Sequence, residues 1–169
     1  MRRTLHYLTS LRKSRIIGDY AIGGAMAATF YIDPVTTFDL DIFVTLPQKP
    51  DGFLVSLASL YAHLRTEGFK EDKECVIIFG VPVQFLPVYN PLLEEALTCA
   101  VEMDYDGVKV PVFSAEHLTA FAVQTGSGKD MARAQSFYES GILDQVKISD
   151  ILARYGLEAK WKQWTANHI

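Results

Sequence analysis

The sequence has few cysteines and no long apolar run. Its 169 residues include two cysteines, Cys75 and Cys99, which are too few for a disulfide framework or a four-ligand zinc site. Both lie among apolar neighbours, as buried thiols usually do. The longest uncharged stretch is shorter than the ~18 to 20 apolar residues that a membrane span needs. We therefore expect a reducing, cytoplasmic location and no membrane partner.

An excess of positive charge is also missing. Sixteen Lys and Arg against 20 Asp and Glu give a net charge of -4, which excludes a surface that coats nucleic acid by bulk attraction. The first 15 residues are the exception, with five cations and no acid. Leu5, Leu8, Leu11 and Ile16 predict an amphipathic helix there. A solvated helix face is the simpler interpretation of its charges, and a phosphate-facing patch is the alternative.

The composition is that of a packed domain, with 49% hydrophobic and 21% charged residues. Glycine and proline punctuate a pattern of alternating strands and helices. After the first helix we expect strands at 19–22, 39–45, 74–79, 81–87, 101–105 and 108–113. We expect further helices at 25–31, 51–67, 91–100, 114–125, 130–140, 149–155 and 160–167. The pattern predicts an α+β fold, in which residues 1–113 form a mixed β-sheet flanked by helices and residues 114–169 a helical C-terminal tail packed on it, together one compact domain.

Two carboxylates interrupt an otherwise apolar strand. Strict alternation places Asp39 and Asp41 on one face, opposite Leu40, Ile42 and Val44. Aspartate is disfavoured in strands, and two like charges about 7 Å apart repel unless a cation lies between them. A hard divalent cation, magnesium in the first place, prefers such oxygens and leaves positions open for substrate phosphates. The structural alternative is an edge strand that exposes two acids to solvent.

A glycine pair precedes the acids, with fourteen residues between Gly24 and Asp39. Gly23 and Gly24 lie between an expected strand and an expected helix. Paired glycines there let the backbone approach a ligand closely and direct the first N–H groups of the helix at an anion. The combination of this pair with two acids favours a phosphate-transfer site over a purely structural role.

The two motifs together resemble the signature of the polymerase-beta-like nucleotidyltransferase superfamily. In that signature a glycine pair after a short strand is followed by an acidic pair with hydrophobic flanks, here Asp39-Leu40-Asp41-Ile42. The small residues 25–28 and the lead Thr36-Thr37-Phe38 resemble stand-alone bacterial and archaeal members. The nearest branch is that of toxin-like nucleotidyltransferases of abortive-infection systems. Segment 80–87 resembles the strand that often carries a third carboxylate, and Lys129-Asp130 resembles a Lys-Asp pair of the family.

The resemblance implies transfer of a nucleoside monophosphate from a nucleoside triphosphate (NTP) to a hydroxyl acceptor, which could be an RNA end, a protein or a small molecule such as an antibiotic. It implies a nucleotidyltransferase-like mixed sheet, and one or two Mg²⁺ ions held by Asp39 and Asp41. Nucleotide contacts would come from five residues: Gly23, Gly24, Thr37, Lys129 and Asp130. In this scheme Lys129 places a charge on a phosphate, and Asp130 orients it or caps the following helix.

The third carboxylate is the departure from the pattern, because Gln84 stands in its place. A glutamine amide oxygen can accept a hydrogen bond or coordinate weakly, but it cannot act as a general base. Glu74, Asp104 and Asp106 are candidate replacements, although ordinary surface charge explains all three. The alternative function is therefore a catalytically weak or inactive relative that binds nucleotide or protein. A third possibility is a toxin restrained by an antitoxin-like partner.

Overall fold

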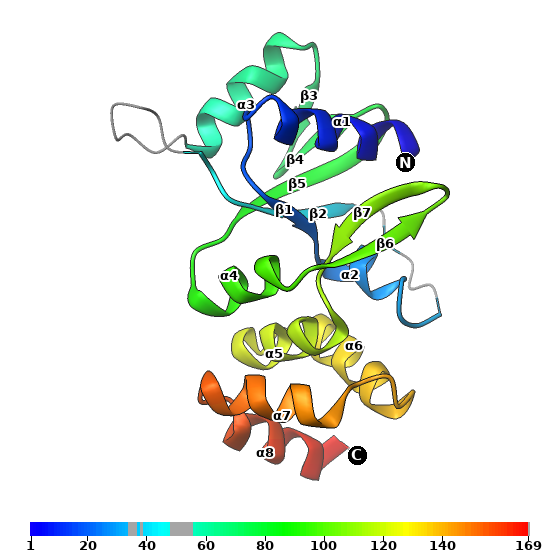
Figure 1. Cartoon of the computed structure of the whole chain (residues 1–169), viewed down its shortest axis with the longest axis vertical. Helices are drawn as coiled ribbons and strands as arrows, with labels where there is room; N and C mark the ends of the chain where they lie inside the picture. Colours follow the sequence, from blue (N-terminus) through cyan, green and yellow to red (C-terminus); the bar gives the residue numbers. More distant parts are fainter. Residues whose placement is uncertain (34–36, 38, 48–55, 169) are drawn as a thin grey trace.

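A computed structural model describes residues 1–33, 37, 39–47 and 56–168 of the chain. Within this part the strands are β1 (Tyr20–Ile22), β2 (Leu40–Val44), β3 (Lys70–Asp72), β4 (Cys75–Ile78), β5 (Val81–Pro87), β6 (Val101–Tyr105) and β7 (Val108–Val112). The helices are α1 (Arg2–Lys13), α2 (Gly24–Ala28), α3 (Leu57–Thr66), α4 (Pro91–Thr98), α5 (Ala115–Thr125), α6 (Gly128–Glu139), α7 (Gln145–Arg154) and α8 (Glu158–His168). Figure 1 shows their arrangement.

The described strands form one seven-stranded mixed sheet in the order β3-β4-β5-β2-β1-β7-β6. β2 lies at its centre, parallel to β5 and antiparallel to β1. Tight turns close three hairpins, and two of these turns have two residues with positive φ: Phe79 and Gly80 at 50° and 82°, and Asp106 and Gly107 at 51° and 82°. This conformation matches the twist of the flanking strands. The predicted α+β class with a mixed sheet is confirmed.

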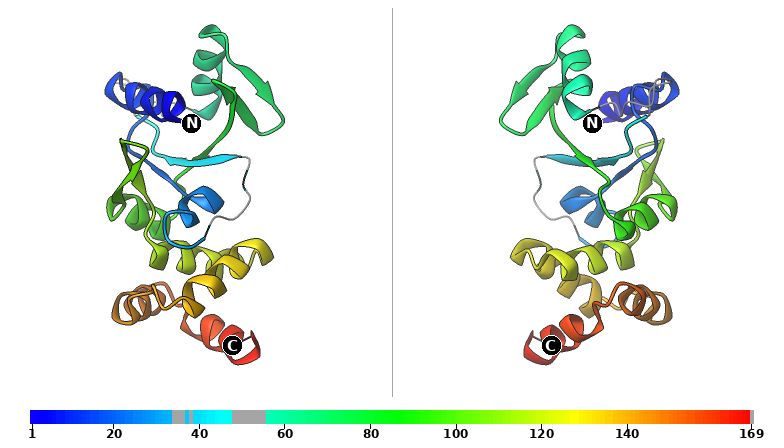
Figure 2. Two further views of the ribbon diagram at one scale, coloured as in Figure 1. Left: turned by 90° about the vertical axis from the view of Figure 1, so that its right-hand side faces the viewer. Right: turned by 90° about the vertical axis from the view of Figure 1, so that its left-hand side faces the viewer.

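Helices cover both faces of the sheet (Figures 1 and 2). On one face, α1 and α3 bury leucines such as Leu8 and Leu64 against Leu40, Ile42 and Val44 of β2. The opposite face packs against α4, and its core contains Ala21, Phe43, Leu93, Ala96 and Phe113. The alternation predicted for β2 is therefore correct, and it leaves the Asp41 side chain on the face away from α1 and α3.

The helices α5 to α8 gather at one end of the molecule (Figures 1 and 2). A polar network around the buried His117 ties this end to α4. His117, which is 1% exposed, contacts Ser114 through Nδ1 at 2.9 Å and Glu95 through Nε2 at 3.2 Å. The Glu95 carboxylate also accepts hydrogen bonds from Arg154 and Tyr155 of the α7 end. The division of the chain at residues 113 and 114 into core and tail stays a prediction.

Several boundaries differ from those predicted. β3 was not expected, because its three residues are charged and exposed and have weak strand preference. α6 begins at Gly128 and not at Asp130, with Ser127 as N-cap. α7 begins at Gln145, because the Asp144 carboxylate accepts hydrogen bonds from the first N–H groups of the helix. The predicted turn at Pro34 and the predicted helix start at residues 51–55 lie outside the described residues.

No helix in the described ranges combines the length and the apolar character needed to cross a bilayer.

Candidate active site

Two adjoining cavities lie between the sheet and the helices that follow it. The larger has a volume of about 900 Å³ and the smaller about 230 Å³. Asp41, Gln84, Asp130 and Arg133 line both. The larger cavity is also lined by Thr37, Asp39 and Lys129, and the smaller by Gly24. The fold therefore brings together every predicted site residue except Gly23, from segments that are far apart in the sequence.

The acidic wall of the larger cavity comes from β2 and the residues before it. Asp39 and Asp41 both line this cavity, as expected for alternate residues on one strand face. Thr37 holds the first of them: its hydroxyl donates to Asp39, with Oγ1 3.1 Å from Oδ1 and 3.2 Å from the Asp39 carbonyl oxygen. Thr37 thus lines the cavity and also orients a carboxylate, a second contact that the sequence did not reveal.

Asp41 is the electrostatically perturbed member of the pair. Burial raises its pKa to about 6, and the negative charge of Asp39 adds to the rise. Arg133 opposes the shift, and Asp130 adds a smaller increase. A bound cation would stabilise the ionised form of Asp41, which burial and a neighbouring acid disfavour.

The glycine pair divides into two different roles. The Gly23 N–H donates to the Asp41 carbonyl oxygen at 2.9 Å, which extends the β1–β2 ladder. The prediction that this N–H binds a phosphate is therefore wrong. A Cβ at Gly23 would lie 2.3 Å from the Phe43 ring. At Gly24, where φ is +57°, a Cβ would lie 1.8 Å from Asp41 Oδ2. Both glycines allow close packing against β2, and Gly24 allows it against the predicted metal ligand.

Gln84 is placed by the pairing of β2 with β5. The parallel register makes it the direct neighbour of Asp41, the position that the resemblance gives to a third carboxylate. Its Nε2 donates to Glu74 Oε2 at 3.1 Å.

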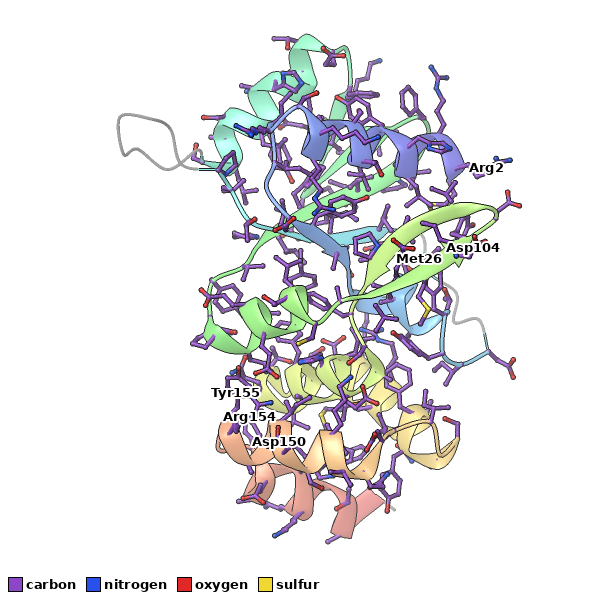
Figure 3. All side chains as sticks on the ribbon, in the orientation of Figure 1. Arg2, Met26, Asp104, Asp150, Arg154 and Tyr155 are labelled. Atoms are coloured by element: carbon purple, nitrogen blue, oxygen red, sulfur yellow. The ribbon has the colours of Figure 1, made fainter. Side chains whose placement is uncertain are left out.

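Of the three acids considered as replacements for a carboxylate at position 84, only Glu74 contacts a residue that lines the cavities. Asp104 instead accepts from the Gly107 N–H and pairs with Lys109, and Asp106 pairs with Arg2. Figure 3 shows Asp104 on the β6–β7 hairpin and Arg2 of α1 close by, both well away from Arg154.

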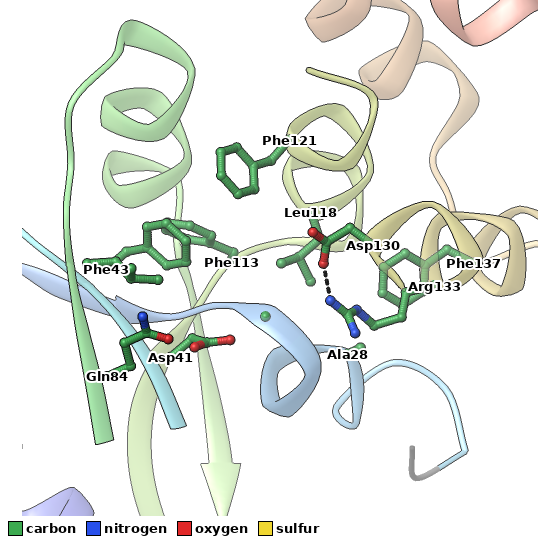
Figure 4. A pocket seen from close by; sticks show the side chains of 12 residues that line it. Ala28, Asp41, Phe43, Gln84, Phe113, Leu118, Phe121, Asp130, Arg133 and Phe137 are labelled. Carbon is green, nitrogen blue, oxygen red and sulfur yellow. Dashed lines mark hydrogen bonds and ion pairs between the residues drawn. The ribbon is translucent and has the colours of Figure 1, made fainter. Parts of the chain in front are cut away.

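The opposite wall belongs to the first turns of α6. Lys129, Asp130 and Arg133 face the larger cavity from there. Asp130 forms an ion pair with Arg133, three residues further along the helix (Figure 4). The expectation that Asp130 caps the helix is wrong, since Ser127 is the N-cap. The alternative, that Asp130 orients Lys129, stays a prediction. The sequence analysis did not identify Arg133 as a site residue. Its i, i+3 spacing from Asp130 on one helix could have indicated that the two side chains are neighbours.

The smaller cavity is mostly apolar and aromatic (Figure 4). Phe43 is central to it: its ring centroid lies 4.9 Å from that of Phe113 and 5.7 Å from that of Phe121. The remaining apolar lining comes from Ala28, Leu86, Leu118 and Phe137. Its polar side chains come from two sides, Asp41 and Gln84 from the sheet and the Asp130–Arg133 pair from α6 (Figure 4). Such a cavity suits a flat apolar ring attached to a polar or charged group.

The basic helix α1 lies apart from both cavities, and none of its residues lines them. Its cations are also partly neutralised. Arg2 pairs with Asp106 at 3.8 Å, Arg12 pairs with Asp19 at 2.6 Å, and the Arg3 guanidinium lies over the Phe79 ring. The simpler interpretation of this segment, a solvated helix face, accounts for the arrangement.

The side chains present suit a magnesium ion in chemistry, although they are fewer than the resemblance implies. The donors are the carboxylates of Asp39 and Asp41 with the amide of Gln84, all oxygen ligands of the kind that Mg²⁺ prefers. In the described part of the chain, no three His, Cys, Asp or Glu residues surround one possible metal position. A cation here would thus have two charged ligands and rely on substrate oxygens or water for the rest.

Comparison with protein-family models finds no match, and comparison with curated protein sequences finds none either. Solved structures do match. The antibiotic-resistance factor ANT(2'')-Ia in solution aligns with a TM-score of 0.54 at 15% identity, over 99% of this chain and 98% of that chain. An antigenic nucleotidyltransferase-like protein from Paracoccidioides brasiliensis aligns at 0.55 and 18% identity, over 94% and 90%. A crystal structure of ANT(2'')-Ia with adenylyl-2''-tobramycin aligns at 0.53 and 14% identity, over 94% and 97%.

These likenesses extend over almost the whole of each chain, and at such low identity they establish the fold. The chain has the fold of the nucleotidyltransferases, as the glycine and acid motifs predicted.

Proposed function

We propose that this protein is a magnesium-dependent nucleotidyltransferase, which moves a nucleoside monophosphate from an NTP to a hydroxyl of a small polar acceptor. One observation carries the proposal: Asp39 and Asp41 face Lys129 and Arg133 across the same cavity of about 900 Å³. An acidic wall opposite a wall that carries two cations is the arrangement expected around a metal-bound polyphosphate. The nucleotidyltransferase fold supports the same activity.

Each wall has its own task in this proposal. Asp39, oriented by Thr37, and Asp41 would hold Mg²⁺, which supplies charge neutralisation on the transferring phosphate. Lys129 and Arg133 face the phosphates and stabilise charge on the non-transferred part. Gln84 places a neutral amide oxygen beside Asp41, and the proton of the attacking hydroxyl passes to water or substrate, since an amide is not a base. The aromatic cavity excludes water from one side of the reacting groups.

A small acceptor is favoured over an RNA end. The basic α1 residues, the reason to consider nucleic acid, do not line the cavities and are partly paired with acids. One matching structure is a complex of ANT(2'')-Ia with adenylyl-2''-tobramycin, a nucleotide joined to a small molecule. The walls of the larger cavity carry three acids against two cations, which favours a neutral or cationic acceptor over an anionic one.

The test is Mg²⁺-dependent consumption of radiolabelled NTPs with pools of small-molecule, RNA and protein acceptors. We expect turnover that is lost in Asp39→Ala and Asp41→Ala. Asp104→Ala is the matched control, because it removes an acid of the β6–β7 hairpin that contacts Lys109 and not the cavities. Turnover that survives both cavity substitutions contradicts the proposal.

A second candidate function is nucleotide binding without turnover. Gln84 beside Asp41, where a third carboxylate is expected, is the observation that favours it. NTP that raises the melting temperature of a protein with no turnover in any acceptor pool would select this alternative. The abortive-infection branch and an antitoxin-like partner stay predictions, for which the genes flanking this one are the first place to look.

A further inference from the structure

Gln84 carries an amide whose two ends have opposite chemistry. Its nitrogen only donates hydrogen bonds, and its oxygen only accepts them. The side chain stands beside Asp41 and lines both cavities. If the nitrogen faced Asp41, the amide would bind that carboxylate and compete with a cation. If the oxygen faces Asp41, the amide adds a third oxygen to those of Asp39 and Asp41. The orientation of this amide therefore decides what it contributes.

Glu74 selects the second orientation. Its Oε2 accepts the hydrogen bond from Gln84 Nε2 at 3.1 Å, and an ionised carboxylate can only accept. A flipped amide would place two oxygens against each other and lose a charge-assisted bond. Figure 4 shows the result, with the amide oxygen of Gln84 on the side of Asp41.

The fold presents Glu74 from a tight turn. Lys73 and Glu74 connect β3 to β4, whose flanking residues Asp72 and Cys75 pair directly. Lys73 has a positive φ of 56°, and the carbonyl oxygen of Glu74 accepts from the Tyr61 hydroxyl at 3.1 Å. The Tyr61 ring in turn packs against Phe85, the residue after Gln84. The backbone that holds Glu74 is thus fixed relative to the strand that holds Gln84.

We propose that Glu74 is a positioning residue that holds the Gln84 amide with its oxygen toward Asp39 and Asp41, so that the cation site is completed by a neutral amide oxygen in place of a third carboxylate. The proposal rests on the proposed function, because it concerns the same site. In this proposal Glu74 does not replace the missing third carboxylate as a general base, since it acts only through Gln84.

The test measures the affinity for Mn²⁺ by water-proton relaxation, in the presence of whichever of four non-hydrolysable NTP analogues binds most tightly. Glu74→Gln keeps the size of the side chain but lets it donate as well as accept, so the Gln84 amide can flip. We expect Mn²⁺ affinity to fall about 10-fold, the lower end of the effect of residues that orient metal ligands. Glu71→Gln is the matched control, because Glu71 lies on the adjacent β3 strand, pairs with Arg65 and lines neither cavity.

A Gln84→Leu variant tests whether Glu74 acts on Mn²⁺ binding through Gln84. Gln84→Leu removes the amide, and we expect it to weaken Mn²⁺ binding as much as Glu74→Gln does. In the Gln84→Leu background, the further change Glu74→Gln should alter the affinity less than twofold. An undiminished effect of Glu74→Gln in that background overturns the proposal, because Glu74 would then act directly. The absence of any effect in the wild-type background overturns it as well.

Asp41→Asn separates this proposal from the proposed function. If wild-type Mn²⁺ binding does not depend on Asp41, the cation site itself is wrong and both proposals fail. If binding depends on Asp41 and is unchanged by Glu74→Gln, only the positioning role of Glu74 fails. Melting temperatures of all variants check that they are folded, which the exposed position of Glu74 in a turn favours.

Discussion

Replacing Gly24 with alanine tests the close approach of α2 to the acidic pair. Gly24 has φ of +57°, a left-handed conformation that costs a residue with a Cβ about 1–2 kcal/mol. The added Cβ would also lie 1.8 Å from Asp41 Oδ2 and 2.8 Å from Cγ, so the carboxylate has to move. Overpacking of this kind costs about 1–3 kcal/mol. We expect a total loss of about 2–5 kcal/mol in the free energy of unfolding.

Gly126→Ala is the matched control. Gly126 has φ of +70° at the end of α5, and a Cβ there meets no atom within 4 Å. This substitution should cost the backbone part alone, about 1–2 kcal/mol. Urea unfolding of both variants gives the difference, which is the free energy of the clash with Asp41.

The clash should disappear when its partner does. In an Asp41→Ala background, Oδ2 and Cγ are gone, and of the three nearest atoms the Asp41 Cβ, at 3.1 Å from the new methyl group, is left. Gly24→Ala should then cost little more than Gly126→Ala. Equal losses for Gly24→Ala and Gly126→Ala in the wild-type protein would refute the close approach.

Three further predictions concern pH and packing. The pKa of Asp41 is raised to about 6 from an ordinary 3.8, so the free energy of unfolding decreases as the pH rises from about 4 to 6. Asp41→Asn should remove this decrease, which urea titrations at several pH values measure. The hydrogen bonds from Arg154 and its neighbours lower the pKa of Glu95 to about 2, so the stability that Glu95 contributes is lost as pH falls from about 4.5 to 2. Glu95→Gln should therefore cost about 1–3 kcal/mol at pH 7, and Glu94→Gln, the exposed neighbour, almost nothing. Phe43→Ala should cost about 3–5 kcal/mol, because the 5% exposed ring packs against Phe113, and calorimetry measures the loss.

The centre of the fold could be predicted because local pattern and burial agree there. Leu40, Ile42 and Val44 alternate with polar or aromatic residues, and only one register buries all three. The same alternation fixed Asp39 and Asp41 on one face before their surroundings were known. The turn at Asp106-Gly107 was also readable, because its conformation strongly favours glycine at the second position.

Contacts between distant segments could not be predicted in the same way. The glycine pair signalled a close approach, but the group that Gly24 approaches is Asp41 and depends on the pairing of β1 with β2. Arg133 lines a cavity together with Asp41 only because α6 packs against α2 and α5, an arrangement that no local pattern encodes.

The role of Glu74 was hidden by an error in local structure. The strand was predicted to begin at Glu74. A residue within a regular strand points its side chain to one of the two faces of the sheet. The charged segment Lys70–Asp72 conceals β3, and without β3 there is no hairpin turn to present Glu74 to Gln84. A short edge strand of charged residues protects the sheet from pairing with other chains. Because such residues have low strand preference, the sequence does not indicate that they form a strand.

The most direct test of the account is a crystal structure with Mn²⁺ and a non-hydrolysable NTP analogue, with the metal located by its anomalous scattering. We expect a peak bound by carboxylate oxygens of both Asp39 and Asp41, with the phosphates between that peak and the side chains of Lys129 and Arg133. A nucleotide seated elsewhere, or a metal that contacts neither aspartate, would contradict it.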